Sequence, residues 1–330
     1  MRRPLFLIPC GILAVLAIFI IILWTPDTDR EAMKAKYGGE AARYSLTDSG
    51  MEVHYRVSGP EDAPALILIH GTSSSLHTWE PLRALLDDRY RVVAYDQPGH
   101  GLTGPHPEHD YTYPGMAAGL DAVFEAESIE RAVLIGNSMG GWVAWVDALE
   151  NPERVEALVL IDALGIPETV DPHANPAFGI AQSAAGRLAM RKVTPRGVVA
   201  SSIEATVADP KLVDDAMIDR YWELLRLPGN RRAAGEQFIS PRAERSDKLS
   251  QIEQPTLIIW GEEDALIFPL AADEFERRIP NARSVTYADV GHLPMEEAPA
   301  RTARDISEFL EANLAGAPLA PIGSASDIPL

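Results

Sequence analysis

Seven apolar runs of strand length divide most of this 330-residue chain into alternating segments. Stretches of helical period separate most of these runs. Continuous apolar runs that alternate with helices are typical of parallel strands covered on both faces. They predict an α/β fold with a mostly parallel central sheet, and we expect the first two to form an antiparallel hairpin at one edge. The runs are MEVHYRV near residue 51, ALILIHG near 65, RVVAYD near 91, AVLIGN near 132, ALVLIDA near 157, TLIIWGEED near 256 and SVTYADVGH near 284.

The longest interval without a strand-like run, about ninety residues, lies between Ala163 and Thr256. It contains helix-like stretches such as LVDDAMIDRYWELLR, and it is too long for a simple crossover between parallel strands. We therefore predict a helical cap, from about residue 164 to 248, over the carboxyl ends of the strands, where active groups of such sheets gather. We expect part of its apolar set to seat the cap and the rest to line an apolar pocket. This set is Phe178, Ile180, Leu188, Met190, Trp222, Leu224, Leu225 and Phe238.

The stretch GNSMGG, residues 136 to 141, joins the apolar run AVLI to the helix-like stretch WVAWVDALE. This pattern predicts a sharp turn between a strand and a helix, with Ser138 at its apex. Gly136 and Gly140 remove side chains that would collide where the strand and the helix approach each other. The turn presents the Ser138 hydroxyl at the carboxyl edge of the sheet, so we interpret Ser138 as a candidate nucleophile.

A serine nucleophile needs a base to take its proton and a carboxylate to orient that base. After the last two strand-like runs, WGEED supplies Asp264 and GHLPMEEAP supplies His292. Glu263 remains an alternative acid, because a one-residue change in the path of the loop would exchange the two carboxylates. A further carboxylate, Asp96 in DQPGHG, we interpret as part of a turn that shapes the floor of the site.

A serine that attacks a carbonyl group also needs donors for the oxyanion that forms during attack. The backbone N–H of Met139, directly after Ser138, is one candidate. The second is the backbone N–H of Thr72 in HGTSSS, where Gly71 permits a tight turn after the strand ALILI.

Taken together, IHGTSSSLHTWEPL, YDQPGHGLTG, LIGNSMGG, LVLIDA, IIWGEED and GHLPMEEAP resemble the α/β-hydrolase superfamily over nearly everything from Tyr44 to Ala315. The chain order Ser138, Asp264, His292 is the order of that family. The resemblance implies an α/β-hydrolase fold and a Ser-His-Asp acyl-enzyme mechanism.

Within that superfamily, the residues favour the esterase and lipase branch. Position 138 is Ser, where the haloalkane dehalogenases and epoxide hydrolases have Asp. Thr72 stands where the perhydrolases have an aromatic residue, and Leu293 where carbon–carbon bond hydrolases have Trp. The expected substrate is a small-molecule ester with an apolar acyl or alcohol group. A carbon–carbon bond hydrolase, another activity of this fold and a catalytically silent ligand-binding protein remain alternatives.

Charge and cysteine content exclude several other classes. The formal net charge of −19 argues against a nucleic-acid partner, because binding to phosphates depends on Lys and Arg. The single cysteine, Cys10, cannot form an internal disulfide, and no Cys/His spacing suits zinc. We expect neither a cofactor nor a metal.

The first residues form an uncharged apolar run of twenty, from Leu5 to Trp24, which as a helix would span about 30 Å. This length predicts a transmembrane anchor, and Arg2 and Arg3 before it place the N-terminus in the cytoplasm and the hydrolase domain outside, in the periplasm if the source is bacterial. A cleavable signal peptide is the alternative. We thus expect an anchor at 1–24, a linker at 25–43, an α/β-hydrolase domain at 44–314 and a flexible tail at 315–330.

Overall fold

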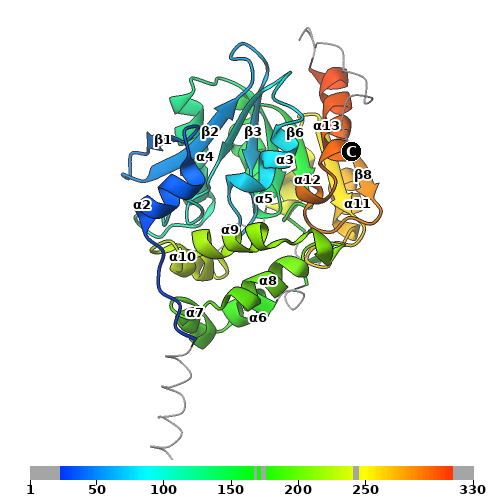
Figure 1. The fold of residues 1–330 in the computed structure, drawn as a ribbon. Helices are drawn as coiled ribbons and strands as arrows, with labels where there is room; N and C mark the ends of the chain where they lie inside the picture. Colours follow the sequence, from blue (N-terminus) through cyan, green and yellow to red (C-terminus); the bar gives the residue numbers. More distant parts are fainter. Residues whose placement is uncertain (1–22, 167–168, 172–175, 241–244, 315–330) are drawn as a thin grey trace, which may run out of the picture.

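The computed structural model describes residues 23–166, 169–171, 176–240 and 245–314 (Figure 1). The predicted anchor, apart from Leu23 and Trp24, and the predicted tail lie outside these residues. Among the helices that are described, none is both long enough and apolar enough to cross a membrane.

An eight-stranded sheet forms the centre of the molecule, in the order β1-β2-β4-β3-β5-β6-β7-β8. From β4 to β8 all neighbours are parallel, and only β1 and β2 run antiparallel to their partners. This is the mixed, mostly parallel sheet that the apolar runs predict. The strands are β1 (Arg43–Leu46), β2 (Glu52–Ser58), β3 (Ala65–Ile69), β4 (Arg91–Tyr95), β5 (Ala132–Asn137), β6 (Val155–Ile161), β7 (Thr256–Gly261) and β8 (Ala282–Tyr287).

The predicted hairpin between the first two apolar runs is wrong. β2 pairs with β1 on one side and with β4 on the other, whereas β3 lies between β4 and β5. All five residues of β3 are buried, which suits a strand with parallel neighbours on both sides. The strand that forms the hairpin with β2 is Arg43–Leu46, a partly exposed run of four residues, RYSL, that lacks an apolar signal.

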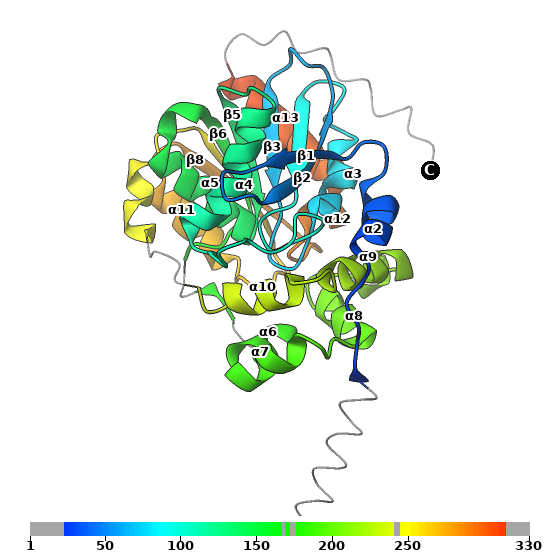
Figure 2. The same cartoon turned by 90° about the vertical axis from the view of Figure 1, so that its left-hand side faces the viewer.

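Helices cover both faces of the sheet (Figure 2). Along β3, Ile67 and Ile69 pack into a core with α4, α5 and α11, while Leu66 and Leu68 pack into a core with α3, α12 and α13. This alternation follows from the two-residue period of a strand and explains why the strands are apolar throughout. These helices are α3 (Glu80–Arg83), α4 (Tyr113–Ala126), α5 (Met139–Glu150), α11 (Leu270–Arg278), α12 (Pro294–Glu297) and α13 (Pro299–Asn313).

Among the described residues, five α-helices lie between β6 and β7 in the sequence and cover one end of the sheet (Figure 1). We call this interval, residues 164–248, the cap segment. No strand of the sheet interrupts its described residues, in agreement with the lack of strand-like runs there. Its helices are α6 (Pro176–Gln182), α7 (Ala184–Met190), α8 (Arg196–Glu204), α9 (Asp215–Leu225) and α10 (Asn230–Gln237).

Residues 23–42 run along the cap segment to the edge of the sheet, as Figures 1 and 2 show. They include the short helix α2 (Arg30–Met33) and one further turn, Lys34–Gly38. The Arg56 guanidinium of β2 donates to the backbone oxygens of Tyr37 and Gly38. The segment that we expected to be a linker is therefore bound to the body of the protein over much of its length.

Candidate active site

Ser138 lies between the last residue of β5 and the first residue of α5, in a left-handed conformation with φ 55° and ψ −119°. A residue with a Cβ rarely adopts such a conformation, which costs about 1–3 kcal/mol and persists only where the surroundings enforce it. Here the Ser138 backbone N–H donates to the Ile161 oxygen at 3.0 Å, and its oxygen accepts from Leu164 at 2.9 Å. The end of β6 therefore fixes the turn that presents the serine.

Two glycines let strand and helix close around this turn. A Cβ on Gly136 would lie 2.3 Å from the Gly140 backbone oxygen, and one on Gly140 would lie 2.0 Å from the Ile69 oxygen. Both distances are far inside van der Waals contact. A side chain at either position would therefore collide with the backbone, as the sequence motif predicts.

His292 and Asp264 meet in the loops that follow β8 and β7. Nδ1 of His292 lies 2.7 Å from Oδ2 of Asp264, and both side chains are buried. The other Asp264 oxygen, Oδ1, accepts backbone N–H groups of Leu266 at 2.8 Å and Ile267 at 3.1 Å. Glu263 is exposed. The structure thus brings Asp264, and not the alternative acid Glu263, to the histidine.

The two candidate oxyanion donors also come together. The Thr72 hydroxyl lies 3.5 Å from the Met139 sulfur, so the turn after β3 and the start of α5 are in contact. Neither the Thr72 nor the Met139 backbone N–H donates to any other described backbone or side-chain group. Two N–H groups without an internal acceptor, beside Ser138, suit an oxyanion hole.

Asp96 has no access to this chemistry. Its carboxylate accepts the backbone N–H groups of Leu76 and Leu102, both at 2.8 Å, and binds His54 Nδ1 at 2.7 Å. Burial raises the Asp96 pKa, but His54, with His77 and His70 nearby, outweighs this and holds the pKa well below its usual range. The interpretation of DQPGHG as a structural turn fits this arrangement.

Asp162 is a buried carboxyl group that the sequence analysis did not single out. It follows β6 directly with φ 44°, and one oxygen accepts the Gly261 N–H at 3.0 Å. Ligand atoms of Asp162, Asp264 and His292 all lie within 4.8 Å of one another, a spacing that could suit a metal, but His292 Nδ1 and Asp264 already bind each other. Burial and the negative charge of Asp264 raise the Asp162 pKa well above its usual range. Asp162 therefore retains its proton to a higher pH than an ordinary Asp side chain does. Its place after a strand-like run is the signal that could have identified it.

We expect Asp162→Asn to raise the melting temperature, by an amount that grows over the pH range above about 4, where an ordinary Asp carboxyl group is ionised. Above about pH 4 the unfolded chain releases this proton while the folded protein retains it, so stability falls as pH rises, by up to about 1.4 kcal/mol per pH unit. Asn cannot ionise, and its amide retains an acceptor for Gly261. Thermal unfolding of both proteins across this pH range measures the effect. An equal difference at every pH would contradict a raised Asp162 pKa.

Two adjacent glutamates tie the histidine loop to the cap segment. The Glu297 carboxylate accepts the N–H groups of Gly291 and Leu293, both at 3.0 Å, and of Ala208 at 2.8 Å. Glu296 pairs with Arg220 of α9 at 2.8 Å. The cap is thereby fixed directly to the loop that carries His292.

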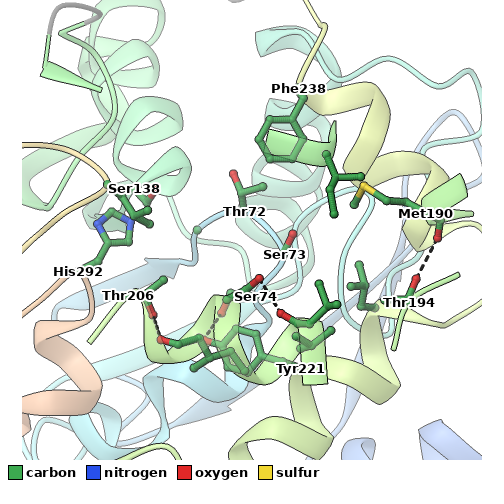
Figure 3. Close-up of a pocket in the computed structure, with 18 of the residues that line it drawn as sticks. Thr72, Ser73, Ser74, Ser138, Met190, Thr194, Thr206, Tyr221, Phe238 and His292 are labelled. Carbon is green, nitrogen blue, oxygen red and sulfur yellow. Dashed lines mark hydrogen bonds between the residues drawn. The ribbon is translucent and has the colours of Figure 1, made fainter. Parts of the chain in front are cut away.

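A pocket of about 320 Å³ lies between the cap segment and the ends of the strands. Ser138 and His292 lie on one side of it, and Met190 and Thr194 lie on the opposite side (Figure 3). Thr72 lines it between them, so its backbone N–H is close to the pocket. No Lys, Arg, Asp or Glu is among the described residues that line it.

The predicted apolar set of the cap segment divides between pocket and packing. Leu224 packs with Leu102 and Leu227. Trp222 packs against the buried cluster of Val199, Ile203 and Ile218. Leu188 is 66% exposed, and the Phe178 side chain lies outside the described part. The members that line the pocket are Ile180, Met190, Leu225 and Phe238.

Comparison with known proteins agrees with this geometry. The family described as alpha/beta hydrolase fold matches residues 64–299. The chain belongs to this family. It is 28% identical over 268 residues to the uncharacterized hydrolase YugF of Bacillus subtilis, covering 81% of this chain and 97% of YugF.

Two further relatives carry more specific names. A 2-hydroxymuconate semialdehyde hydrolase of Pseudomonas putida is 27% identical, covering 87% of this chain and 95% of its own length. A crystal structure titled as a membrane phospholipase A, a bacterial virulence factor, is 26% identical with a TM-score of 0.71, covering 96% of this chain and all of that one. The family and its hydrolase members thus identify the chain as a hydrolase of this fold.

Proposed function

We propose that this protein is a membrane-anchored serine hydrolase that cleaves carboxylic esters with an apolar acyl or alcohol group. The observation that carries the proposal is the apolar pocket that leads to Ser138 and His292. A pocket of this kind binds hydrocarbon and leaves one reactive end for the polar ester group.

In this mechanism the Ser138 hydroxyl attacks the ester carbonyl while Nε2 of His292 takes its proton. Asp264 holds Nδ1–H and stabilises the imidazolium. The backbone N–H groups of Thr72 and Met139 bind the oxyanion, each contributing on the order of 3 kcal/mol. His292 then gives the proton to the alcohol as it leaves. In the second half, His292 takes a proton from the water that attacks the acyl carbon, and returns it to the Ser138 oxygen as the carboxylic acid is released.

The name of the P. putida relative favours a second candidate, hydrolysis of a carbon–carbon bond in an anionic substrate. No lysine or arginine lines the described pocket, and an anion buried there would lack a partner. The ester substrate is therefore the better fit. The membrane phospholipase A, an ester hydrolase by its name, supports it further.

We expect kcat/KM for p-nitrophenyl esters to rise with acyl length, by up to about fourfold per methylene, and to fall once the pocket is full. The reason is that each added methylene is transferred from water to the apolar walls. Steady-state kinetics on an ester series measures this, with a carbon–carbon bond substrate of the muconate type in parallel. A flat profile, or turnover of that substrate alone, would contradict the proposal.

The anchor proposal rests on the uncharged run from Leu5 to Trp24, with the N-terminus cytoplasmic and the catalytic residues on the other side of the membrane. Extraction of membranes with alkaline carbonate tests it. The full-length protein should stay in the pellet, whereas release of shortened, active protein would favour a cleaved signal peptide.

A further inference from the structure

The far side of the substrate pocket includes a residue from outside the catalytic domain expected from the sequence. Leu23, at the end of the predicted anchor, lines the pocket together with Val193, Thr194 and Pro195 of the cap segment. In Figure 3, Thr194 lies across the pocket from Ser138 and His292. An apolar group bound at Ser138 would therefore extend toward this wall.

Hydrogen bonds hold the chain beside Leu23 against this part of the cap. The Thr25 backbone N–H donates to the Lys192 oxygen at 2.8 Å, and the Thr25 hydroxyl accepts the Thr194 N–H at 2.8 Å. Thr25 is buried by these contacts. The two bonds flank Val193, which itself lines the pocket.

Charged and polar groups continue the attachment toward β1. Asp27 pairs with Lys192 at 2.8 Å and with Arg231, whose guanidinium also donates to the Thr25 oxygen at 2.8 Å. Thr28 follows, with its N–H on the Arg226 oxygen at 3.0 Å. Partners on α10, on both sides of Val193 in the sequence and at the end of α9 thus hold this segment in place.

We propose that Leu23 forms the far wall of the substrate pocket and limits the length of the apolar chain that the enzyme accepts. This inference rests on the proposed function, since it concerns the substrate of the same site. It assigns the substrate class as esters whose apolar chain is long enough to reach from Ser138 to this wall, so that the end of the chain lies against Leu23. Leu23, at the end of the predicted anchor, is then part of the active site.

Variants of Leu23 in the full-length protein test the proposal. Leu23→Ala lengthens the pocket, so the ratio of kcat/KM for a long ester over a short one should rise about tenfold, and Leu23→Trp should lower that ratio by a similar factor. Trp24→Ala is the matched control. Trp24 is the next residue but is 51% exposed and does not line the pocket, so the wild-type profile should remain.

A second measurement does not depend on hydrolysis. Thermal shifts caused by saturated fatty acids of increasing length, measured on the same variants, report which chain length fits best. If the best-fitting chain length is greater for Leu23→Ala and smaller for Leu23→Trp while no ester is cleaved, the far wall is supported and the proposed activity is wrong. Unchanged length preference in both Leu23 variants, or an equal change in Trp24→Ala, would overturn the inference.

Discussion

Replacement of Ser138 by Ala is expected to lower kcat for ester hydrolysis by about 10⁴- to 10⁶-fold and to leave the fold intact. The Ser138 hydroxyl supplies the electrons for the covalent bond, and no other described group stands at the same strained turn between β5 and α5. His292→Ala should cost about as much, and the double variant little more than either, because the members of a triad act as a unit. Steady-state kinetics and labelling by a fluorophosphonate probe measure these effects.

Ser202→Ala is the control for these variants. Ser202 also lines the pocket, but its hydroxyl donates to the Val198 oxygen at 2.8 Å within α8. This variant should keep its labelling and most of its activity. Labelling of Ser138→Ala at the wild-type rate would show that another residue is the nucleophile, and the silent ligand-binding alternative would gain support if the wild type is not labelled.

The parts of the site that sequence could predict are those fixed by local pattern. Ser138, Asp264 and His292 each follow an apolar run, and parallel strands bring their carboxyl ends to one edge of the sheet. Spacing alone could not decide between Asp264 and Glu263, since that depends on the path of the loop. In the fold, the Glu263 N–H bonds to the Val290 oxygen and its side chain is exposed, which leaves Asp264 facing the histidine.

Local sequence pattern could not predict contacts between segments that are far apart in the chain. The bond from Arg231 to the Thr25 oxygen joins residues 206 positions apart, and residues 25–43 carry no periodicity that would predict their docking. The same limit applies within α9. Its helical pattern shows that Leu224 and Leu225 are both apolar, but only the fold shows that Leu224 packs on Leu102 while Leu225 lines the pocket.

Asp264→Asn is expected to lower kcat by about 10⁴-fold, with little change in stability, because it changes the tautomer of His292. Asp264 Oδ1 accepts hydrogen bonds from two backbone N–H groups, those of Leu266 and Ile267. An Asn carbonyl oxygen would take that position, which turns the amide NH₂ toward Nδ1 of His292. The proton of the imidazole must then move to Nε2.

With its proton on Nε2, His292 cannot accept the proton of Ser138, so attack on the ester becomes slow while substrate binding is preserved. A fall in kcat with an almost unchanged KM is therefore the expected signature. Glu263→Gln changes the neighbouring carboxylate in the same way, but Glu263 is exposed and should leave kcat near the wild-type value. If Glu263→Gln abolishes activity and Asp264→Asn does not, the acid of this site is Glu263 and the loop after β7 takes a different path during catalysis.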